Sequence, residues 1–184
     1  MFVPVTLTLG DLGGIVTEYG PECPWQEQWY RTREHLKELK KVYQPGGFPG
    51  DTAARAAVED FFQHSVHLGD WLWSDRASGR DENEVRYFIK NDRALKICAG
   101  LANTSKHRGR DRQGSMNAVV RRVWHYQAAD SAVATVEWWL QGQEANRHRV
   151  DALELAERCT AVWREYLKSH NLRLSDLLGH EDPP

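Results

Sequence analysis

Four segments of the chain repeat their apolar residues every three to four positions, which is the period of an α-helix that buries one face. These segments cover residues 25–43, 51–73, 84–104 and 151–170. Helices with apolar stripes of this length bury the stripes against one another. The pattern therefore predicts a mainly α protein, built as an antiparallel helical bundle of four to five helices.

Between the third and fourth helical segments, the apolar residues change to the two-residue period of β-strands. Val119 and Val123 lie in the first expected strand, Val133 and Val136 lie in the second, and the stretch QAADSA joins them. We therefore expect a β-hairpin at 117–142 that is inserted between two helices.

The chain of 184 residues fits a single domain with one core. Near the N-terminus, apolar residues alternate with polar ones, which favours an extended arm rather than a helix. The expected parts are an arm at 1–24, a helical core at 25–115 and 149–170, the hairpin at 117–142 and a frayed tail at 180–184.

The net charge of −2 provides no global field that would draw the protein to nucleic acid, so any RNA contact needs a local basic patch. No segment has the length and apolar character of a membrane span, and the N-terminal FVPVTLTL lacks the basic leader of a secretory signal. Cys23, Cys98 and Cys159 are too few and too widely spaced for a disulfide framework or a metal pair. We expect a cytoplasmic protein without a cofactor, in which Cys98 and Cys159 are buried as small hydrophobic residues.

Three helix ends carry sequence signals. Asp51 or Thr52 is expected to cap the second helical segment. Asp151 and Glu154 have the spacing of a capping box at the start of the last segment. Asn171 suits the left-handed conformation that ends a helix.

The second helical segment places Asp60, His64, His67 and Trp71 on one stripe. A carboxylate and two imidazoles on one face could bind a divalent metal. The same pattern is typical of histidines that are hydrogen-bonded into a packed interface beside a tryptophan, and we prefer that interpretation. Asp70 follows His67 by three residues and could fix the tautomer of its imidazole.

The third helical segment runs into the stretch LANTSKHRGR at residues 101–110, where polar and basic groups gather. Asn103 and His107 are one helical turn apart, and Lys106 lies beside His107. Neighbouring cations favour the neutral imidazole, which suits a general base near neutral pH. Further cations that could hold phosphates follow at Arg108, Arg110 and Arg112.

These groups would suffice for a metal-independent attack of a ribose 2′-hydroxyl on its phosphate. His107 would be the general base or acid, Lys106 would stabilise the transition state, and Asn103 would orient the phosphate or the ring. We expect His67 and Asp70 to approach this group from the neighbouring helix. The alternative interpretation is a helix C-terminus whose cations complement the helix dipole.

Two further features extend these hypotheses. Arg121 and Arg122 are adjacent on an expected strand, where consecutive side chains face opposite ways, so at most one of them joins the basic patch directly. The triplet EWW at 137–139 could provide an aromatic surface for a protein partner.

The stretch LANTSKH resembles a motif of the HEPN superfamily (higher eukaryote and prokaryote nucleotide-binding domains). Its ribonuclease members carry an arginine, a polar residue, three variable residues and a histidine. On this chain Asn103 matches the polar residue, His107 matches the histidine, and Ala102 stands where those members have arginine. The chain is also similar to bacterial helical-bundle proteins with an N-x-x-K-H motif, over FFQHSVHLGDWLW, LKICAGLANTSKH and VDALELAERCTAVWREYL.

This resemblance implies a helical bundle, a homodimer, and RNA or a nucleotide as ligand. It suggests a HEPN-like domain, which would be a metal-independent endoribonuclease or an RNA-binding protein of a toxin–antitoxin or phage-defence system. The alternative is a non-catalytic adaptor, which Ala102, the near-neutral charge and the eight tryptophans favour. A second alternative is a metal-binding helical bundle with a site at Asp60, His64 and His67.

Overall fold

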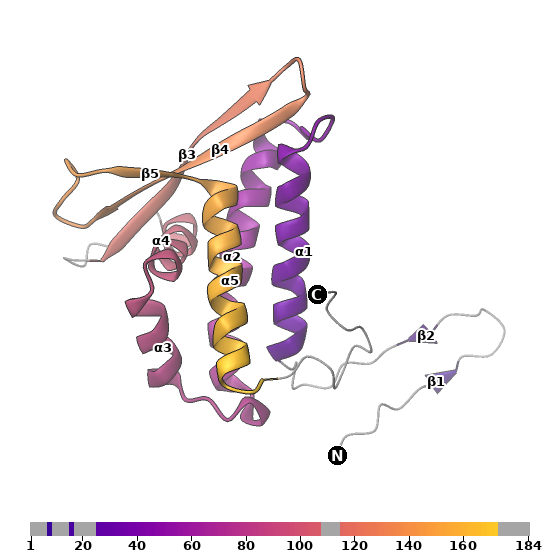
Figure 1. The fold of residues 1–184 in the computed structure, drawn as a ribbon, viewed down its shortest axis with the longest axis vertical. Coiled ribbons are helices and arrows are strands. Elements are labelled where there is room, and N and C mark those ends of the chain that lie inside the picture. Colours follow the sequence, from indigo (N-terminus) through magenta and orange to yellow (C-terminus); the bar gives the residue numbers. More distant parts are fainter. Residues whose placement is uncertain (1–6, 9–14, 17–24, 108–114, 173–184) are drawn as a thin grey trace.

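The computed structural model describes residues 7–8, 15–16, 25–107 and 115–172, and for residues 105–107 it describes the backbone alone. Within these residues, five α-helices and a three-stranded antiparallel sheet make up the body of the protein (Figure 1). The prediction of a mainly α protein is confirmed.

The helices of the described residues fall into two groups. The long helices α1 (Trp25–Tyr43), α2 (Asp51–Ser74) and α5 (Ala152–Ser169) lie side by side. The shorter helices α3 (Glu82–Asn91) and α4 (Arg93–His107) pack against α2, and a single 3₁₀ turn at Arg76–Ser78 leads into α3. The sheet closes one end of the long helices (Figure 1).

The sheet has the strand order β3-β4-β5. Strands β3 (Met116–Tyr126) and β4 (Ser131–Leu140) form the expected hairpin, which is confirmed. The third strand, β5 (His148–Asp151), pairs with β4 and was not predicted, because its four residues run straight into α5 and leave no period to read. Of the expected N-terminal arm, the described residues contain a small ladder between β1 (Leu7–Thr8) and β2 (Ile15–Val16). The remainder of the arm and the tail lie outside the described residues.

The core is built around α2, which is buried at Phe61, Phe62 and Leu68. Trp163 of α5 is fully buried against it and donates a hydrogen bond from Nε1 to Ser65 Oγ at 3.2 Å. The predicted burial of Cys98 and Cys159 is confirmed. Because these side chains face inward from several helices, the apolar stripes of the sequence meet in one core.

The sheet contributes only one of its faces to this core. Its buried apolar residues follow the two-residue period and, apart from Trp138, are small, namely Ala118, Val120, Ala132, Ala134 and Val136. Small side chains let the strands approach the helices closely: a Cβ at Gly100 of α4 would lie 2.9 Å from the carbonyl oxygen of Met116. The opposite face, called the outer face below, carries the alternate residues of each strand.

The single helix expected over 84–104 is wrong, because the chain breaks at Asp92 into α3 and α4. Asp92 has an extended backbone conformation, and its carboxylate accepts a hydrogen bond from the amide of Leu95 at 2.9 Å. An aspartate side chain that caps a helix start replaces the hydrogen bond that a continuous helix would make. The apolar period continues through the break, so periodicity alone could not reveal it.

The other helix ends test three predictions. The carboxylate of Asp151 caps α5 by accepting from the amides of Leu153 and Glu154, and Asn171 ends the helix with a φ of 55°, as predicted. The predicted cap of α2 is wrong. Gly50 is the N-cap residue there, and no side chain makes a capping hydrogen bond.

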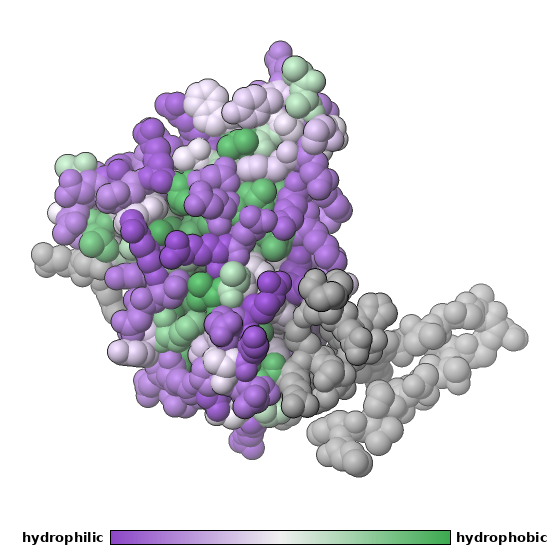
Figure 2. Space-filling view, viewed as in Figure 1, coloured by the Kyte–Doolittle hydropathy of each residue, from purple (hydrophilic) through white to green (hydrophobic). Residues whose placement is uncertain are grey.

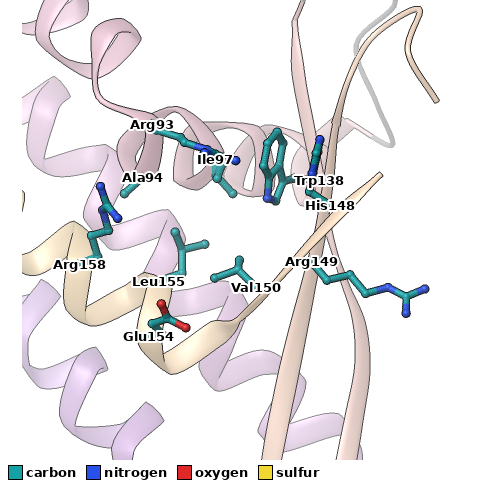
Figure 3. A pocket seen from close by; sticks show the side chains of 10 residues that line it. All are labelled: Arg93, Ala94, Ile97, Trp138, His148, Arg149, Val150, Glu154, Leu155 and Arg158. Atoms are coloured by element: carbon teal, nitrogen blue, oxygen red, sulfur yellow. The ribbon is translucent and has the colours of Figure 1, made fainter. Parts of the chain in front are cut away.

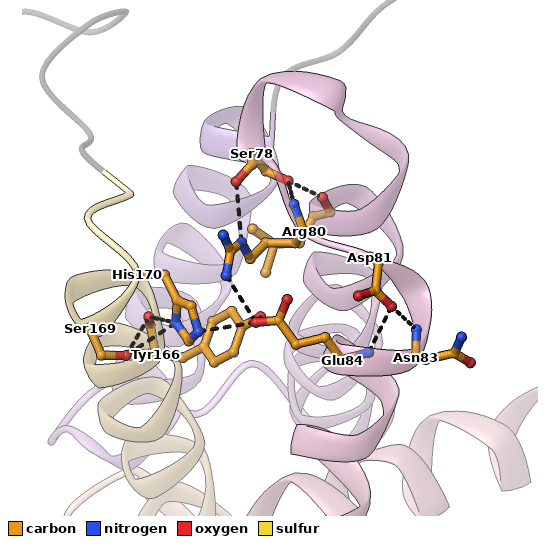
Figure 4. Close-up of polar contacts among 9 residues, drawn as sticks. Ser78, Arg80, Asp81, Asn83, Glu84, Tyr166, Ser169 and His170 are labelled. Carbon is orange, nitrogen blue, oxygen red and sulfur yellow. Dashed lines mark hydrogen bonds and ion pairs between the residues drawn. The ribbon is translucent and has the colours of Figure 1, made fainter.

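Two polar junctions hold α5 at its two ends. At its start, the Tyr43 hydroxyl lies 3.1 Å from Asp151 Oδ2 and accepts from the amide of Ala134 at 3.0 Å, which joins α1, β4 and α5. At its end, Glu84 Oε1 lies 3.0 Å from Arg80 Nη1, 3.1 Å from the Tyr166 hydroxyl and 3.1 Å from His170 Nε2 (Figure 4). Burial raises the pKa of both tyrosines, so they remain neutral hydrogen-bonding groups.

Candidate functional site

His64, in the middle of the α2 stripe, is packed against α1 in the way that the preferred interpretation predicts. The ring of His64 stacks on that of His35 with centroids 4.1 Å apart. The buried amide of Gln28 donates to the carbonyl oxygen of His64 at 2.8 Å and lies 3.1 Å from His64 Nδ1. Because an amide nitrogen is a donor, Nδ1 accepts and the ring proton sits on Nε2.

This environment favours the neutral form of His64. The pKa of His64 is lowered from 6.5 to about 4, mainly by burial and then by the nearby His35, His67 and Arg31. A proton on Nδ1 would also point at the Gln28 amide, which has no lone pair to accept it. His64 is therefore a packing residue of the α1–α2 interface.

The second alternative, a metal site on α2, is not supported. Among the described residues, no group of three or more His, Cys, Asp or Glu side chains is placed to hold a metal ion. Asp60, His64 and His67 are all described, so they do not form such a group. The physical reason is that His64 turns its ring toward His35 and Gln28 on α1.

The lowered pKa of His64 predicts an acid-sensitive fold. His64 takes up a proton near pH 6.5 in the unfolded chain but only near pH 4 in the folded protein. The contribution of His64 to the free energy of unfolding is therefore fully present above pH 6.5 and is lost as the pH is lowered toward 4. The full shift corresponds to about 3 kcal/mol, which partial exposure of the ring reduces to roughly 1–2 kcal/mol. The free energy of unfolding in urea is to be measured at a series of pH values. His64→Asn keeps an acceptor for Gln28, and we expect this variant to lose less stability on acidification than the wild type, by the amount that His64 contributes. Equal losses in the two proteins would contradict this assignment.

The residues predicted from LANTSKH are described only in part. Helix α4 continues to His107, so Asn103 and His107 are one turn apart on a single helix, and Asn103 is partly buried. The side chains of Lys106 and His107, and the whole of Arg108, Arg110 and Arg112, lie outside the described residues. On α2, His67 and Asp70 are both partly buried and both engaged in contacts.

The outer face of the sheet carries a group of cationic and aromatic side chains that the sequence patterns did not predict as a site. Arg122, Trp124 and Tyr126 alternate along β3 away from the buried face. Trp124 is 52% exposed and Tyr126 is 56% exposed, although large aromatic side chains are usually buried. The guanidinium of Arg122 lies 5.3 Å from the Trp124 ring. The spacing R-x-W-x-Y was the available signal, since it puts the three on one face of a strand.

The strict alternation on which the prediction for Arg121 and Arg122 depends is interrupted in the structure. Val120 pairs with Val136 and Arg122 with Thr135, so Arg121 is an extra residue in β3, a β-bulge. A bulge breaks the alternation of side chains at that point. Arg122 contacts Trp124, and the charge of Arg121 helps to lower the pKa of Glu137.

Two more arginines reach the outer face from β5 and the loop before it. Arg147 Nη1 lies 2.8 Å from Glu137 Oε1, and Arg149 Nε lies 3.2 Å from Glu137 Oε2. The hydrogen bond from Arg147 is the main reason that the pKa of Glu137 is lowered, so this 3% exposed carboxylate stays ionised. Arg147 also lies over Trp139, 4.4 Å from the ring centroid.

The predicted aromatic surface at 137–139 is wrong. Glu137 and Trp138 are buried, and Trp139 is half-buried beneath Arg147. Consecutive strand residues face opposite sides, so Trp138 points inward toward α4 while its two neighbours point outward. The exposed aromatic residues of this sheet are Trp124 and Tyr126, near the tip of the hairpin.

The outer face differs from the rest of the protein surface in its charge and in its shape. Among the described residues, Arg121, Arg122, Arg147 and Arg149 gather on or beside this face around the carboxylate of Glu137, in a protein whose net charge is −2. The molecular face seen in Figure 2 is mostly hydrophilic, and its hydrophobic residues gather only in small groups. An open sheet with arginines between aromatic rings can stack flat groups and pair with phosphates.

Comparisons with protein-family models, with curated proteins and with solved structures found no match to this chain. In the described part of the chain, no helix has the length and apolar character needed to cross a membrane.

Proposed function

We propose that the protein binds single-stranded RNA across the outer face of the β3-β4-β5 sheet. The observation that carries this proposal is the row Arg122, Trp124 and Tyr126, exposed on β3 and flanked by further arginines. Bases stack on such aromatic rings regardless of sequence, and guanidinium groups pair with the phosphates between them. A protein partner is the outcome to consider if RNA fails to bind.

RNA binding would serve the cleavage that the HEPN-like resemblance implies. In this proposal His107 removes the proton from a ribose 2′-hydroxyl, Lys106 stabilises the charge on phosphorus, and Asn103 orients the phosphate. These three residues end α4, and only residues 108–115 separate α4 from β3. The setting would be a cytoplasmic toxin–antitoxin or phage-defence system.

The proposal also covers the arrangement of the helices, the N-terminal arm and the oligomeric state. We infer that the helices form an antiparallel bundle, that residues 1–24 extend from it as an arm, and that two chains associate as a homodimer. Sedimentation of the purified protein at micromolar concentration tests the dimer, and a purely monomeric protein would refute it.

The binding proposal is tested with a short fluorescent single-stranded RNA and fluorescence anisotropy. We expect binding that weakens with salt, with a slope of log K against log salt no steeper than about −3, since four arginines neutralise at most four phosphates. Double-stranded RNA of the same sequence should bind more weakly, because its bases are not free to stack. Absence of binding at low salt would refute the proposal.

Cleavage is tested separately, in EDTA, on the same RNA. We expect His107→Ala to lower the cleavage rate by roughly 10²- to 10⁴-fold, which is the usual contribution of a general base. The variant should bind RNA as the wild type does, because His107 is not part of the outer face. If every RNA tried binds without being cut, the protein is an RNA-binding protein and not a ribonuclease.

A further inference from the structure

A cavity of about 290 Å³ lies on the inner side of β5, between the first turns of α4 and α5 (Figure 3). Its volume is near the lower limit for pockets that bind small molecules. Its lining includes Arg93 and Ile97 of α4, Glu154, Leu155 and Arg158 of α5, and Trp138 of β4. His148 and Arg149 are consecutive on β5, so they face opposite sides of the sheet. The cavity is therefore separate from the outer face.

Two cations in the walls of the cavity, Arg93 and Arg158, are important for its chemistry. Within the described residues, neither Arg93 nor Arg158 forms an ion pair, whereas Arg149 turns away from the cavity and pairs with Glu137 (Figure 3). Glu154 is the single carboxylate of the lining, and it does not pair with Arg158 although the two are one helical turn apart. Two guanidinium groups without an ion pair, one of them stacked on Trp138, beside one carboxylate favour an anionic ligand.

The floor of the cavity is apolar and its aromatic wall is rigid. Ile97 and Leu155 are 4% and 3% exposed. The Trp138 ring stands between the Arg93 guanidinium, 4.9 Å away, and the His148 ring, 4.3 Å away (Figure 3). Arg93 and His148 therefore cover the two faces of the indole and hold it in place, so the apolar surface offered to a ligand is that of Ile97 and Leu155.

We propose that this cavity binds a small phosphate monoester with an apolar or aromatic body. Arg93 and Arg158 pair with the phosphate, because the guanidinium fork matches the geometry of its oxygens. The body packs on Ile97 and Leu155. The phosphate could belong to a free small molecule or to the 5′ end of an RNA strand, and the chemistry of recognition is the same for both.

The proposal is tested by calorimetry with 1-naphthyl phosphate, 1-naphthol and inorganic phosphate. We expect 1-naphthyl phosphate to bind roughly ten-fold tighter than either of the others, because only this probe engages both the cations and the apolar floor. Equal binding of the three probes, or no binding of 1-naphthyl phosphate, would overturn the proposal.

Variants separate the cavity from the rest of the protein. Arg93→Gln and Arg158→Gln are expected to weaken 1-naphthyl phosphate roughly ten-fold each, and Glu154→Gln to strengthen it by removing a repelling charge. Arg164→Gln, an exposed arginine on α5 that does not line the cavity, is the matched control and should have no effect. Circular dichroism confirms that each variant is folded. Normal binding by folded Arg93→Gln and Arg158→Gln proteins would also overturn the proposal.

The source of the phosphate is decided with a 5′-phosphorylated RNA and its 5′-hydroxyl counterpart. A preference for the phosphorylated strand that Arg158→Gln removes assigns the site to the RNA end, and equal affinity of the two strands assigns it to a free molecule. Trp124→Ala should leave the binding of 1-naphthyl phosphate unchanged, so failure of the outer-face proposal is distinguishable from failure of this one.

Discussion

Replacing both Trp124 and Tyr126 by alanine is expected to weaken binding of single-stranded RNA by about 30-fold or more. Each base stacked on an aromatic ring contributes about 1–3 kcal/mol, so loss of two platforms costs about 2 kcal/mol at least. Both side chains are more than half exposed and contribute little to the core, so the fold should persist. Fluorescence anisotropy with the labelled RNA measures the effect, and circular dichroism checks the fold.

The chain offers a matched control in Tyr87, which is 72% exposed on α3 and distant in sequence from the sheet. Tyr87→Ala should bind RNA as the wild type does. If the Trp124→Ala/Tyr126→Ala protein bound RNA as the wild type does, the outer face would not be the RNA-binding surface. The exposed rings would then favour the adaptor alternative.

Trp163→Ala is expected to lower the free energy of unfolding by about 3–5 kcal/mol, the usual cost of truncating a fully buried tryptophan. Trp163 is 0% exposed, packs against Phe88 with centroids 5.7 Å apart, and donates to Ser65 across α5 and α2. The substitution leaves both a cavity and an unpaired buried hydroxyl. Urea unfolding followed by circular dichroism measures the change.

Trp124→Ala serves as the control for the stability measurement and should change the free energy of unfolding by about 0.5 kcal/mol or less, because the site is exposed. Trp163→Phe should fall between the wild type and Trp163→Ala, since it retains a ring in the core but loses the hydrogen bond to Ser65. If Trp163→Ala unfolded like the wild type, the packing of α5 on α2 described above would be wrong.

Local signals in the sequence predicted the long helices and the hairpin well. Helix α1 begins and ends where the apolar period does, at Trp25 and Tyr43. The start of α5 was predictable because Asp151 caps the helix through residues only two and three positions away. Interactions over such short distances are encoded in neighbouring residues, so they can be read without knowing the fold.

The break at Asp92 and the strand β5 were not predictable by the same means. Asp92 interrupts a helix whose apolar period continues on both sides, and a capping carboxylate has no unique sequence signature there. His148–Asp151 forms a strand because β4 offers it an edge. Pairing of this kind depends on a partner that is distant along the chain.

The candidate sites divide in the same way. The sequence by itself determined which residues are neighbours on a helix, such as Asn103 and His107 on α4, because helical spacing is a local property. Only the tertiary structure decided which side chains are exposed. It buried Trp138, exposed Trp124, and placed a bulge in β3 at Arg121. The outer face and the cavity depend on where the helices cover the sheet, and that packing follows from contacts between segments far apart in the chain.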